Sequence, residues 1–255
     1  MSSSFFNTED EISARISRAV HVLVCFDVEA LLPGADKPAP FSRQLGTLSM
    51  LPGVTVALLS GRSRAELQSQ VGIPGLVYVG NLGLEISGDG FLYVEPTAAG
   101  YSDALSQLGA RLAAKLEQIP GALVEDKGLT IRIAATGVPD TEVENVRRVI
   151  HETLAGADHP FRLDQRDNVY EIRPRVPWTK ANAILWIKER QKQPEALVVF
   201  ISDDDKDEET LAALPGAITV KVGGPTETLA TYRLEGPADL RAFLTWLENV
   251  LRKRS

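Results

Sequence analysis

Apolar residues follow two patterns along this chain. Continuous apolar runs, at residues 22–26 and 197–201, predict strands buried on both faces of a sheet. Apolar residues spaced three or four apart predict helices, the first over residues 8–19, where Thr8 and Glu11 have capping-box spacing. Because the two patterns alternate, we expect an α/β fold with a Rossmann-like parallel sheet between helices.

The alternation occupies the first and last thirds of the chain. Ser63, followed three residues later by Glu66, predicts the start of a helix. The other elements expected here are strands at 22–27, 54–59, 76–79, 196–201 and 218–222, and helices at 178–190, up to about 214 and at 237–251.

The middle third has a different order of elements. After Pro96 the pattern predicts helix, two strands, helix, two strands, which is an αββαββ module with an antiparallel sheet. We therefore expect a discontinuous core domain, residues 1–97 and 176–255, and an inserted α+β domain, residues 98–175.

Composition narrows the function class. The chain is 44% hydrophobic and 24% charged, as in soluble globular proteins, and its net charge of −7 supplies no basic field for nucleic acid or a membrane. Its apolar runs are too short to span a bilayer, and the N-terminus lacks a signal peptide, so we expect a cytoplasmic protein. The lone Cys25 lies in an apolar strand and is expected to be a buried, inert thiol.

Candidate chemistry lies at the ends of the core strands, where open α/β sheets bind ligands. Asp27 ends an apolar strand, Ser60 and Gly61 precede a helix, and Lys180 begins another helix. Residues 203–209 contain six acids in seven positions, which repel one another unless cations lie among them. A hard cation such as Mg²⁺ suits carboxylates that face a phosphate.

Each of these features also has a structural interpretation. Asp27 could form a turn, and Ser60 and Ser63 could cap the following helix, the capping role being favoured for Ser63. Lys180 could be solvated, and the acid run could be the first turn of a solvated helix. Together, and in this order, they favour a site.

In order and spacing, these segments resemble the trehalose-6-phosphate phosphatases of the haloacid dehalogenase (HAD) superfamily, over about residues 22–247. The blocks that carry the resemblance are FDVEALL, LLSGRS, GNLGLEI, VEDKG, EIRPRVPWTKANAI, FISDDDKDEETL and VKVGG…TETLATYRL. The αββαββ insertion matches that family's mobile cap domain.

The resemblance implies a mechanism and its residues. Asp27 would be the nucleophile, Glu29 the general acid and base, and Lys180 a partner of Asp27 and the phosphoryl group. The remaining implied roles are phosphate binding by Ser60, Gly61 and Arg62; Mg²⁺ binding by Asp27, the Glu29 carbonyl, Asp203 and Asp204; support of the metal by Asp207; and sugar binding by the cap residues Glu125 and Lys127.

Several positions depart from the family pattern. Glu29 replaces an Asp and Leu31 a Thr in the first motif, so activity is expected to be low. Leu82 replaces a His, and Ala134, Ala135 and Thr136 replace His-Tyr-Arg in the cap. In the fourth motif, Ser202 replaces a Gly and Lys206 replaces a Thr, which puts a positive charge inside the metal cluster.

The sequence therefore predicts a Mg²⁺-dependent phosphatase acting on a small sugar phosphate, trehalose 6-phosphate above all. Two alternatives stay open: a phosphatase for another sugar or glycerate phosphate, and a pseudophosphatase that binds a sugar phosphate or regulates a partner synthase. We expect a monomer.

Overall fold

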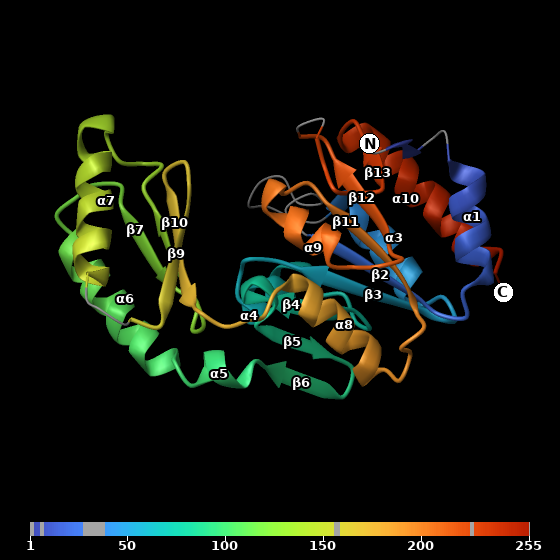
Figure 1. Cartoon of the computed structure of the whole chain (residues 1–255), viewed down its shortest axis with the longest axis horizontal. Coiled ribbons are helices and arrows are strands. Elements are labelled where there is room, and N and C mark those ends of the chain that lie inside the picture. Colours follow the sequence, from blue (N-terminus) through green and yellow to red (C-terminus); the bar gives the residue numbers. More distant parts are fainter. Residues whose placement is uncertain (1–2, 6–7, 28–38, 156–158, 225–226, 255) are drawn as a thin grey trace. The chain divides into compact units, whose positions relative to one another are not determined.

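The computed structural model describes residues 3–5, 8–27, 39–155, 159–224 and 227–254. It divides into two compact units, Met1–Tyr93 with Trp178–Ser255, and Val94–Pro177 (Figure 1). We call them the core unit and the inserted unit. The expected boundaries near residues 97 and 176 lie within a few residues of these limits.

The core unit is built on one large sheet. In the described part of the chain it has nine strands, in the order β1-β13-β12-β11-β2-β3-β4-β5-β6. Neighbours from β1 to β4 pair in parallel and β5 runs antiparallel to β4, so the predicted parallel sheet is confirmed in its centre. The strands are β1 (Ser3–Ser4), β2 (Val22–Asp27), β3 (Val54–Leu59), β4 (Val77–Gly80), β5 (Glu85–Gly88), β6 (Phe91–Val94), β11 (Leu197–Ser202), β12 (Ile218–Val222) and β13 (Tyr232–Leu234).

Helices cover both faces of this sheet because the central strands are apolar on both sides (Figure 1). Alternate residues of β2 enter different cores: Val24 packs with residues of α1, α3 and α10, whereas Cys25 packs with residues of α8 and α9. These helices are α1 (Glu9–Arg18), α3 (Ala39–Ser49), α8 (Lys180–Arg190), α9 (Glu208–Ala212) and α10 (Pro237–Arg252), and α4 (Arg64–Val71) contributes Leu67 to the first core.

Some elements of the core unit and one helix cap differ from the sequence prediction. The apolar pattern does not predict α3, the short edge strands β1 and β13, or the β5 and β6 pair. The helix at residues 8–19 is confirmed as α1, but the capping box is wrong: Thr8 makes no side-chain cap bond, and its hydroxyl donates to the Phe5 carbonyl at 2.9 Å.

The inserted unit has the predicted αββαββ order. Its described sheet is antiparallel, in the order β7-β8-β10-β9, and leucine, isoleucine and valine residues of α6 and α7 pack on one face of it. The elements are α5 (Pro96–Ala99), α6 (Ser102–Leu116), β7 (Leu123–Asp126), β8 (Ile131–Ala134), α7 (Asp140–Leu154), β9 (Phe161–Arg166) and β10 (Val169–Pro174). The other face carries charged side chains.

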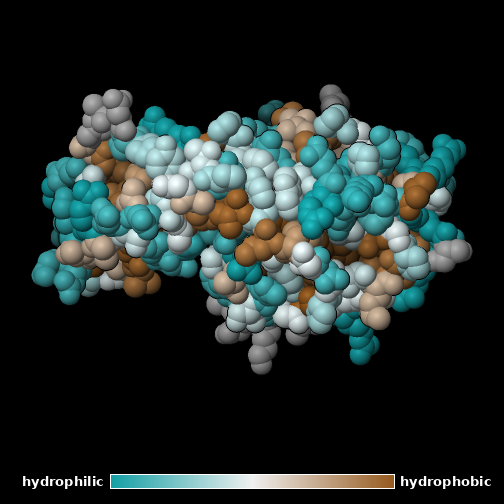
Figure 2. All heavy atoms as spheres, turned by 90° about the horizontal axis from the view of Figure 1, so that it is seen from below, coloured by the Kyte–Doolittle hydropathy of each residue, from teal (hydrophilic) through white to brown (hydrophobic). Residues whose placement is uncertain are grey.

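The surface visible in Figure 2 is mostly hydrophilic or intermediate in hydropathy, with apolar side chains in patches. No helix in the described part of the chain has the length and apolar character needed to cross a membrane. Cys25 is fully buried, and burial raises the pKa of its thiol, as expected for an inert cysteine.

Candidate active site

Three adjacent strands end at the same level of the core sheet. Phe26 of β2 pairs with Ile201 of β11, and Asp27 pairs with Leu59 of β3. Asp27 therefore lies in one row with Ser202, the last residue of β11, and beside Ser60, which directly follows β3. This is the carboxyl edge of the sheet, where we expect the chemistry of an open α/β fold.

Lys180 connects two buried carboxylates at this edge. Its ammonium donates to Asp27 and, at 2.8 Å, to Asp207 Oδ1. Asp27, Lys180 and Asp207 are 1%, 7% and 2% exposed, so the solvated-lysine alternative is wrong. Ser202 Oγ donates to the other Asp207 oxygen at 2.5 Å. Both oxygens of Asp207 are thus engaged by protein groups.

The start of α8 fixes Lys180 in this place. Thr179 and Asn182 form a reciprocal capping box, in which each side chain accepts a hydrogen bond from the other residue's backbone N–H. Burial alone lowers the pKa of Lys180, but the charges of Asp27 and Asp207 outweigh burial and raise it. The two carboxylates therefore favour the charged form of Lys180, which is held by the first turn of α8.

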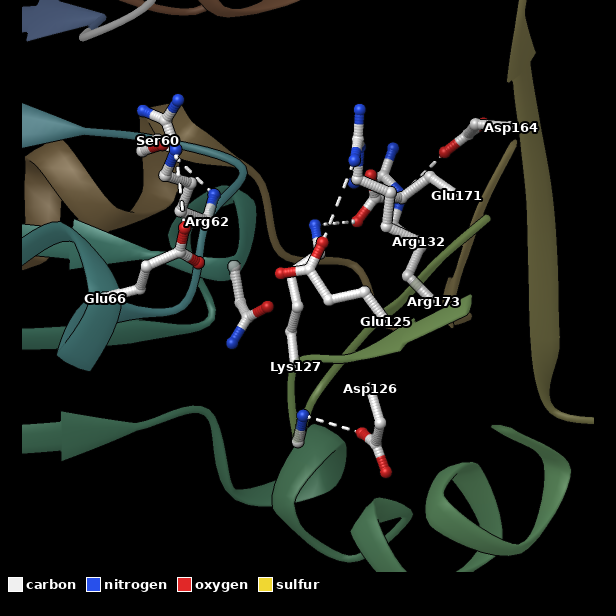
Figure 3. Close-up of polar contacts among 12 residues, drawn as sticks. Ser60, Arg62, Glu66, Glu125, Asp126, Lys127, Arg132, Asp164, Glu171 and Arg173 are labelled. Carbon is white, nitrogen blue, oxygen red and sulfur yellow. Dashed lines mark hydrogen bonds and ion pairs between the residues drawn. The ribbon is translucent and has the colours of Figure 1, made fainter. Parts of the chain in front are cut away.

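The loop after β3 contains Ser60, Gly61 and Arg62, the residues expected to bind phosphate. Ser60 is fully buried, and the Arg62 N–H donates to its Oγ at 3.0 Å. Arg62 Nε lies 3.6 Å from Glu66 Oε1 (Figure 3). Ser63 caps α4, since its side chain accepts from the Glu66 N–H, which confirms the structural interpretation of Ser63.

Two glycines allow the end of β4 and the turn after it to pack tightly against the starts of α4 and α8. A Cβ on Gly80 would lie 2.2 Å from the Arg64 nitrogen, and one on Gly83, where φ is +103°, would lie 3.0 Å from the Thr179 carbonyl oxygen. Leu82, which stands where the family carries a His, has a φ of +59°, and its Cδ2 would lie 3.5 Å from a Cβ on Gly61. An apolar side chain therefore lies beside the loop expected to bind phosphate.

The acid run passes from a turn into a helix: Asp205–Asp207 form a single 3-10 turn, and Glu208 and Glu209 are the first residues of α9, as the helical alternative expected for that part of the run. Asp204 Oδ1 accepts from the Lys206 N–H at 3.0 Å, and the Asp204 N–H donates to Ser202 Oγ at 3.0 Å. Burial raises the pKa of Asp203 to about 6, and the negative charges of Asp27 and Asp204 add to the rise. Asp203 and Asp27 are thus close enough to repel each other.

The cation buried at this turn is not the one expected. Lys206, predicted to lie inside the metal cluster, is exposed. Lys221 of β12 is instead fully buried, and its Nζ lies 2.8 Å from Asp205 Oδ1 and donates to the Asp203 carbonyl at 3.1 Å. The sequence signal that could have revealed it is one lysine within the apolar strand at 218–222.

The carboxylates fit a hard divalent cation. In the part of the chain that the structure describes, no group of three or more His, Cys, Asp or Glu side chains could hold a metal. Asp27 and Asp203 nevertheless provide two mutually repelling carboxylates, and Mg²⁺ usually binds one or two carboxylates together with waters and phosphate. Glu29 and Leu31 lie outside the described residues.

The inserted unit carries its own charged network on the open face of its sheet (Figure 3). Lys127 Nζ donates to Glu171 Oε1 at 2.9 Å. In the strand register, Arg132 of β8 lies opposite Glu125 of β7 on one side and Glu171 of β10 on the other. The Arg132 guanidinium is 3.8 Å from Glu125. The two residues expected to bind sugar, Glu125 and Lys127, therefore belong to one sheet face rich in donors and acceptors.

A cavity of about 490 Å³ lies at the opposite, amino edge of the core sheet. Arg15, Arg18 and Lys188 line it together with apolar residues such as Leu185 and Leu214. None of the predicted site residues lines this cavity, so it is separate from the candidate active site.

Comparison with known proteins agrees with this arrangement. The family model described as trehalose-phosphatase matches residues 37–232. The trehalose-phosphate phosphatase of Mycobacterium marinum is 28% identical over 234 residues, which cover 86% of this chain and 60% of that protein. The chain thus spans about 60% of the length of this curated relative.

Solved structures share the fold. A crystal structure described as a trehalose-6-phosphate phosphatase related protein matches with a TM-score of 0.76 at 18% identity, over 91% of this chain and 100% of that one. The C-terminal domain of the Candida albicans trehalose synthase regulatory protein matches with a TM-score of 0.71 at 17% identity, over 92% and 97%. At these identities the similarity establishes the fold alone.

Proposed function

We propose that this chain, which belongs to the trehalose-phosphatase family, is a Mg²⁺-dependent phosphatase that hydrolyses a sugar phosphate, with trehalose 6-phosphate as the first candidate substrate. The observation that supports this most is the buried arrangement of Asp27, Lys180 and Asp207 at the carboxyl edge of the sheet. Two buried acids around a buried lysine are costly to keep unless the site uses them.

Asp27 is the proposed nucleophile. One of its carboxylate oxygens attacks the phosphorus, the bond to the sugar oxygen breaks, and an aspartyl-phosphate forms. The Lys180 ammonium, already bound to Asp27, lies where it can also offset negative charge on the transferred phosphoryl group. Ser60, the Gly61 N–H and Arg62 are proposed to hold the phosphate oxygens.

Glu29 is the proposed acid and base. As a carboxylic acid it gives its proton to the leaving sugar oxygen. As a carboxylate it then takes a proton from the water that attacks the phosphorus, which releases phosphate and restores Asp27. A Glu reaches one methylene farther than the Asp of the family, and a misplacement of about 1 Å can cost roughly 10²-fold in rate.

Asp27, Asp203 and the Glu29 carbonyl are the proposed Mg²⁺ ligands, with support from Asp204 and Asp207. When bound, the cation neutralises charge on the phosphoryl group. The Lys180 and Ser202 side chains engage both oxygens of Asp207, so Asp207 acts through hydrogen bonds rather than as a direct ligand.

The inserted unit is proposed to act as the cap that recognises the sugar. Glu125 and Lys127 lie on a polar sheet face, and ionised groups bind neutral hydroxyls through charge-assisted hydrogen bonds. Closure of such a unit over a core domain would exclude water during phosphoryl transfer.

Phosphate release from trehalose 6-phosphate and from a panel of sugar and glycerate phosphates, with and without Mg²⁺, tests the proposal. We expect slow, Mg²⁺-dependent release, and one phosphate per chain trapped on Asp27 would identify the nucleophile. The Glu29→Asp, Leu31→Thr double variant should be faster. No release from any member of the panel by either protein would contradict the proposal.

A binding function without turnover is the second candidate, because Glu29 and Leu31 replace the acid and the hydroxyl of the first motif. In that case the native chain would bind trehalose 6-phosphate, or a partner synthase, yet release no phosphate. Turnover by the native chain that is lost in Asp27→Asn would rule it out.

A further inference from the structure

We propose that Lys221 positions Asp203, a proposed metal ligand. It does so by connecting residues 203–207, which we call the acid turn, to strand β12. The inference rests on the proposed function, since the position of Asp203 matters for chemistry only if the chain binds Mg²⁺.

Lys221 is a charged residue in a strand that is otherwise apolar or neutral. All five residues of β12 are buried, and the Lys221 side chain is 1% exposed. A buried ammonium is strongly unfavourable unless it is hydrogen-bonded and paired. Two of its partners are the Asp203 carbonyl and the Asp205 carboxylate, and both belong to the acid turn.

The sheet register explains why this lysine reaches the turn. Lys221 lies directly opposite Ser202, the last residue of β11, so its side chain is next to the point where the chain leaves the sheet. The segment after β12 also leaves room for the pair, since a Cβ on Gly224 would lie 3.1 Å from Asp205 Oδ1 and 3.3 Å from Lys221 Cε.

Several contacts hold the turn in place, and Lys221 connects it to β12. The Asp204 N–H donates to Ser202 Oγ, and Ser202 and Lys180 both donate to Asp207, which fixes residues 204 and 207 to β11 and α8. The ammonium of Lys221 bonds the main chain of Asp203 itself. Removing it would leave the Asp203 carbonyl without this bond.

A role through charge and a role through positioning predict opposite changes in Mg²⁺ affinity when Lys221 is removed. An ammonium near a Mg²⁺ site repels the cation, so a role through charge alone predicts tighter Mg²⁺ binding once the ammonium is removed. A positioning role predicts weaker binding, because groups that orient a metal ligand typically contribute about 10-fold to 100-fold in metal affinity.

The experiment compares Lys221→Met, Lys221→Arg and the matched control Lys188→Met, a lysine of α8 remote from the turn. Mg²⁺ affinity is measured by calorimetry without substrate, and backbone hydrogen exchange is followed over residues 203–207. For Lys221→Met we expect about 10-fold weaker Mg²⁺ binding and faster exchange confined to the turn. Lys221→Arg should keep part of the Mg²⁺ affinity and part of the protection from exchange. The control should match the native protein.

Equal or tighter Mg²⁺ binding by Lys221→Met would overturn the inference, as would unchanged exchange in the turn. If Lys221→Met does not fold, Lys221→Arg decides, since Mg²⁺ binding as tight as in the native chain would then overturn it. Failure of the proposed function looks different: the native chain would itself bind no Mg²⁺ and release no phosphate, and both proposals would fall.

Discussion

Each unit of the molecule contains a buried lysine bound to carboxylates, but the surroundings differ. In the core unit Lys180 contacts Asp27 and Asp207, whose side chains are 2% and 3% exposed. In the inserted unit Lys127 contacts Glu171, which is 15% exposed, and nearby Glu125 and Arg132 are 45% and 43% exposed. Water therefore reaches the acids of the second network and not those of the first.

This difference indicates different uses for the same residue types. Charges that water cannot reach depend on each other, so the core arrangement is fixed in geometry and suits bond making and breaking. Charges at an open sheet face can exchange a protein partner for a ligand hydroxyl at little cost. We therefore expect core substitutions to act on kcat and on stability, and substitutions in the inserted unit to act on KM.

The largest effect should come from Asp27→Asn. An amide cannot act as the nucleophile, so kcat should fall by at least about 10³-fold with trehalose 6-phosphate. Phosphate release is the measurement, and Asp89→Asn, an exposed residue of the β5–β6 turn, is the control. Turnover that survives in Asp27→Asn would exclude an aspartyl-phosphate on this residue.

Lys180→Met should come next and should affect both rate and stability. It leaves Asp27 and Asp207 buried without their cation, which costs about 3–5 kcal/mol in the free energy of unfolding, and kcat should fall by about 10²-fold. Urea denaturation and phosphate release measure the two effects. Lys188→Met should stay within about 0.5 kcal/mol of the native protein. A stability loss no larger than that control's would mean that water reaches the core acids after all.

Lys127→Met should raise KM by about 10-fold and leave kcat nearly unchanged, because it removes a hydrogen bond to the substrate that is equal in ground and transition states. Its stability loss should be smaller than that of Lys180→Met, since water can solvate Glu171. Lys115→Met on α6 of the same unit is the control. A drop in kcat with KM unchanged would break the division between the two units.

The elements that the sequence predicted well are those whose pattern depends on burial alone. Strands β2 and β3 occupy their predicted residues because a strand inside a parallel sheet needs an unbroken apolar run. Helix α3 has a weaker pattern that includes Pro40 and Gly46, and β13 and β1 are short strands that exist through pairing with each other and with β12. Such pairing is not visible in a local pattern.

The residues of the candidate site also differ in how well the sequence predicts them. Asp27, Ser60 and Lys180 could be predicted because strand ends and helix starts converge at one edge of the sheet. The sequence marks Lys221 only as a lysine within an apolar strand. Its partners could not be predicted, since they follow β11 and only the register between β11 and β12 brings them to Lys221. For the same reason the sequence predicts Lys206, rather than Lys221, as the cation of the acid turn.

The smallest effect should be a pH-dependent stabilisation by Mg²⁺. Burial raises the pKa of Asp203 to about 6 from 3.8, so its contribution to the stability of the metal-free protein is complete below pH 3.8 and is lost as the pH rises through 6. Mg²⁺ needs the carboxylate, so its effect has the opposite sign. At ten times its Kd, Mg²⁺ should raise Tm by about 3 °C at pH 7.5 and by less at pH 5. In Asp203→Asn both the rise and its dependence on pH should disappear. A Tm rise that is equal at the two pH values would show that Mg²⁺ binds elsewhere, and that the repulsion between Asp27 and Asp203 is not what the cation relieves.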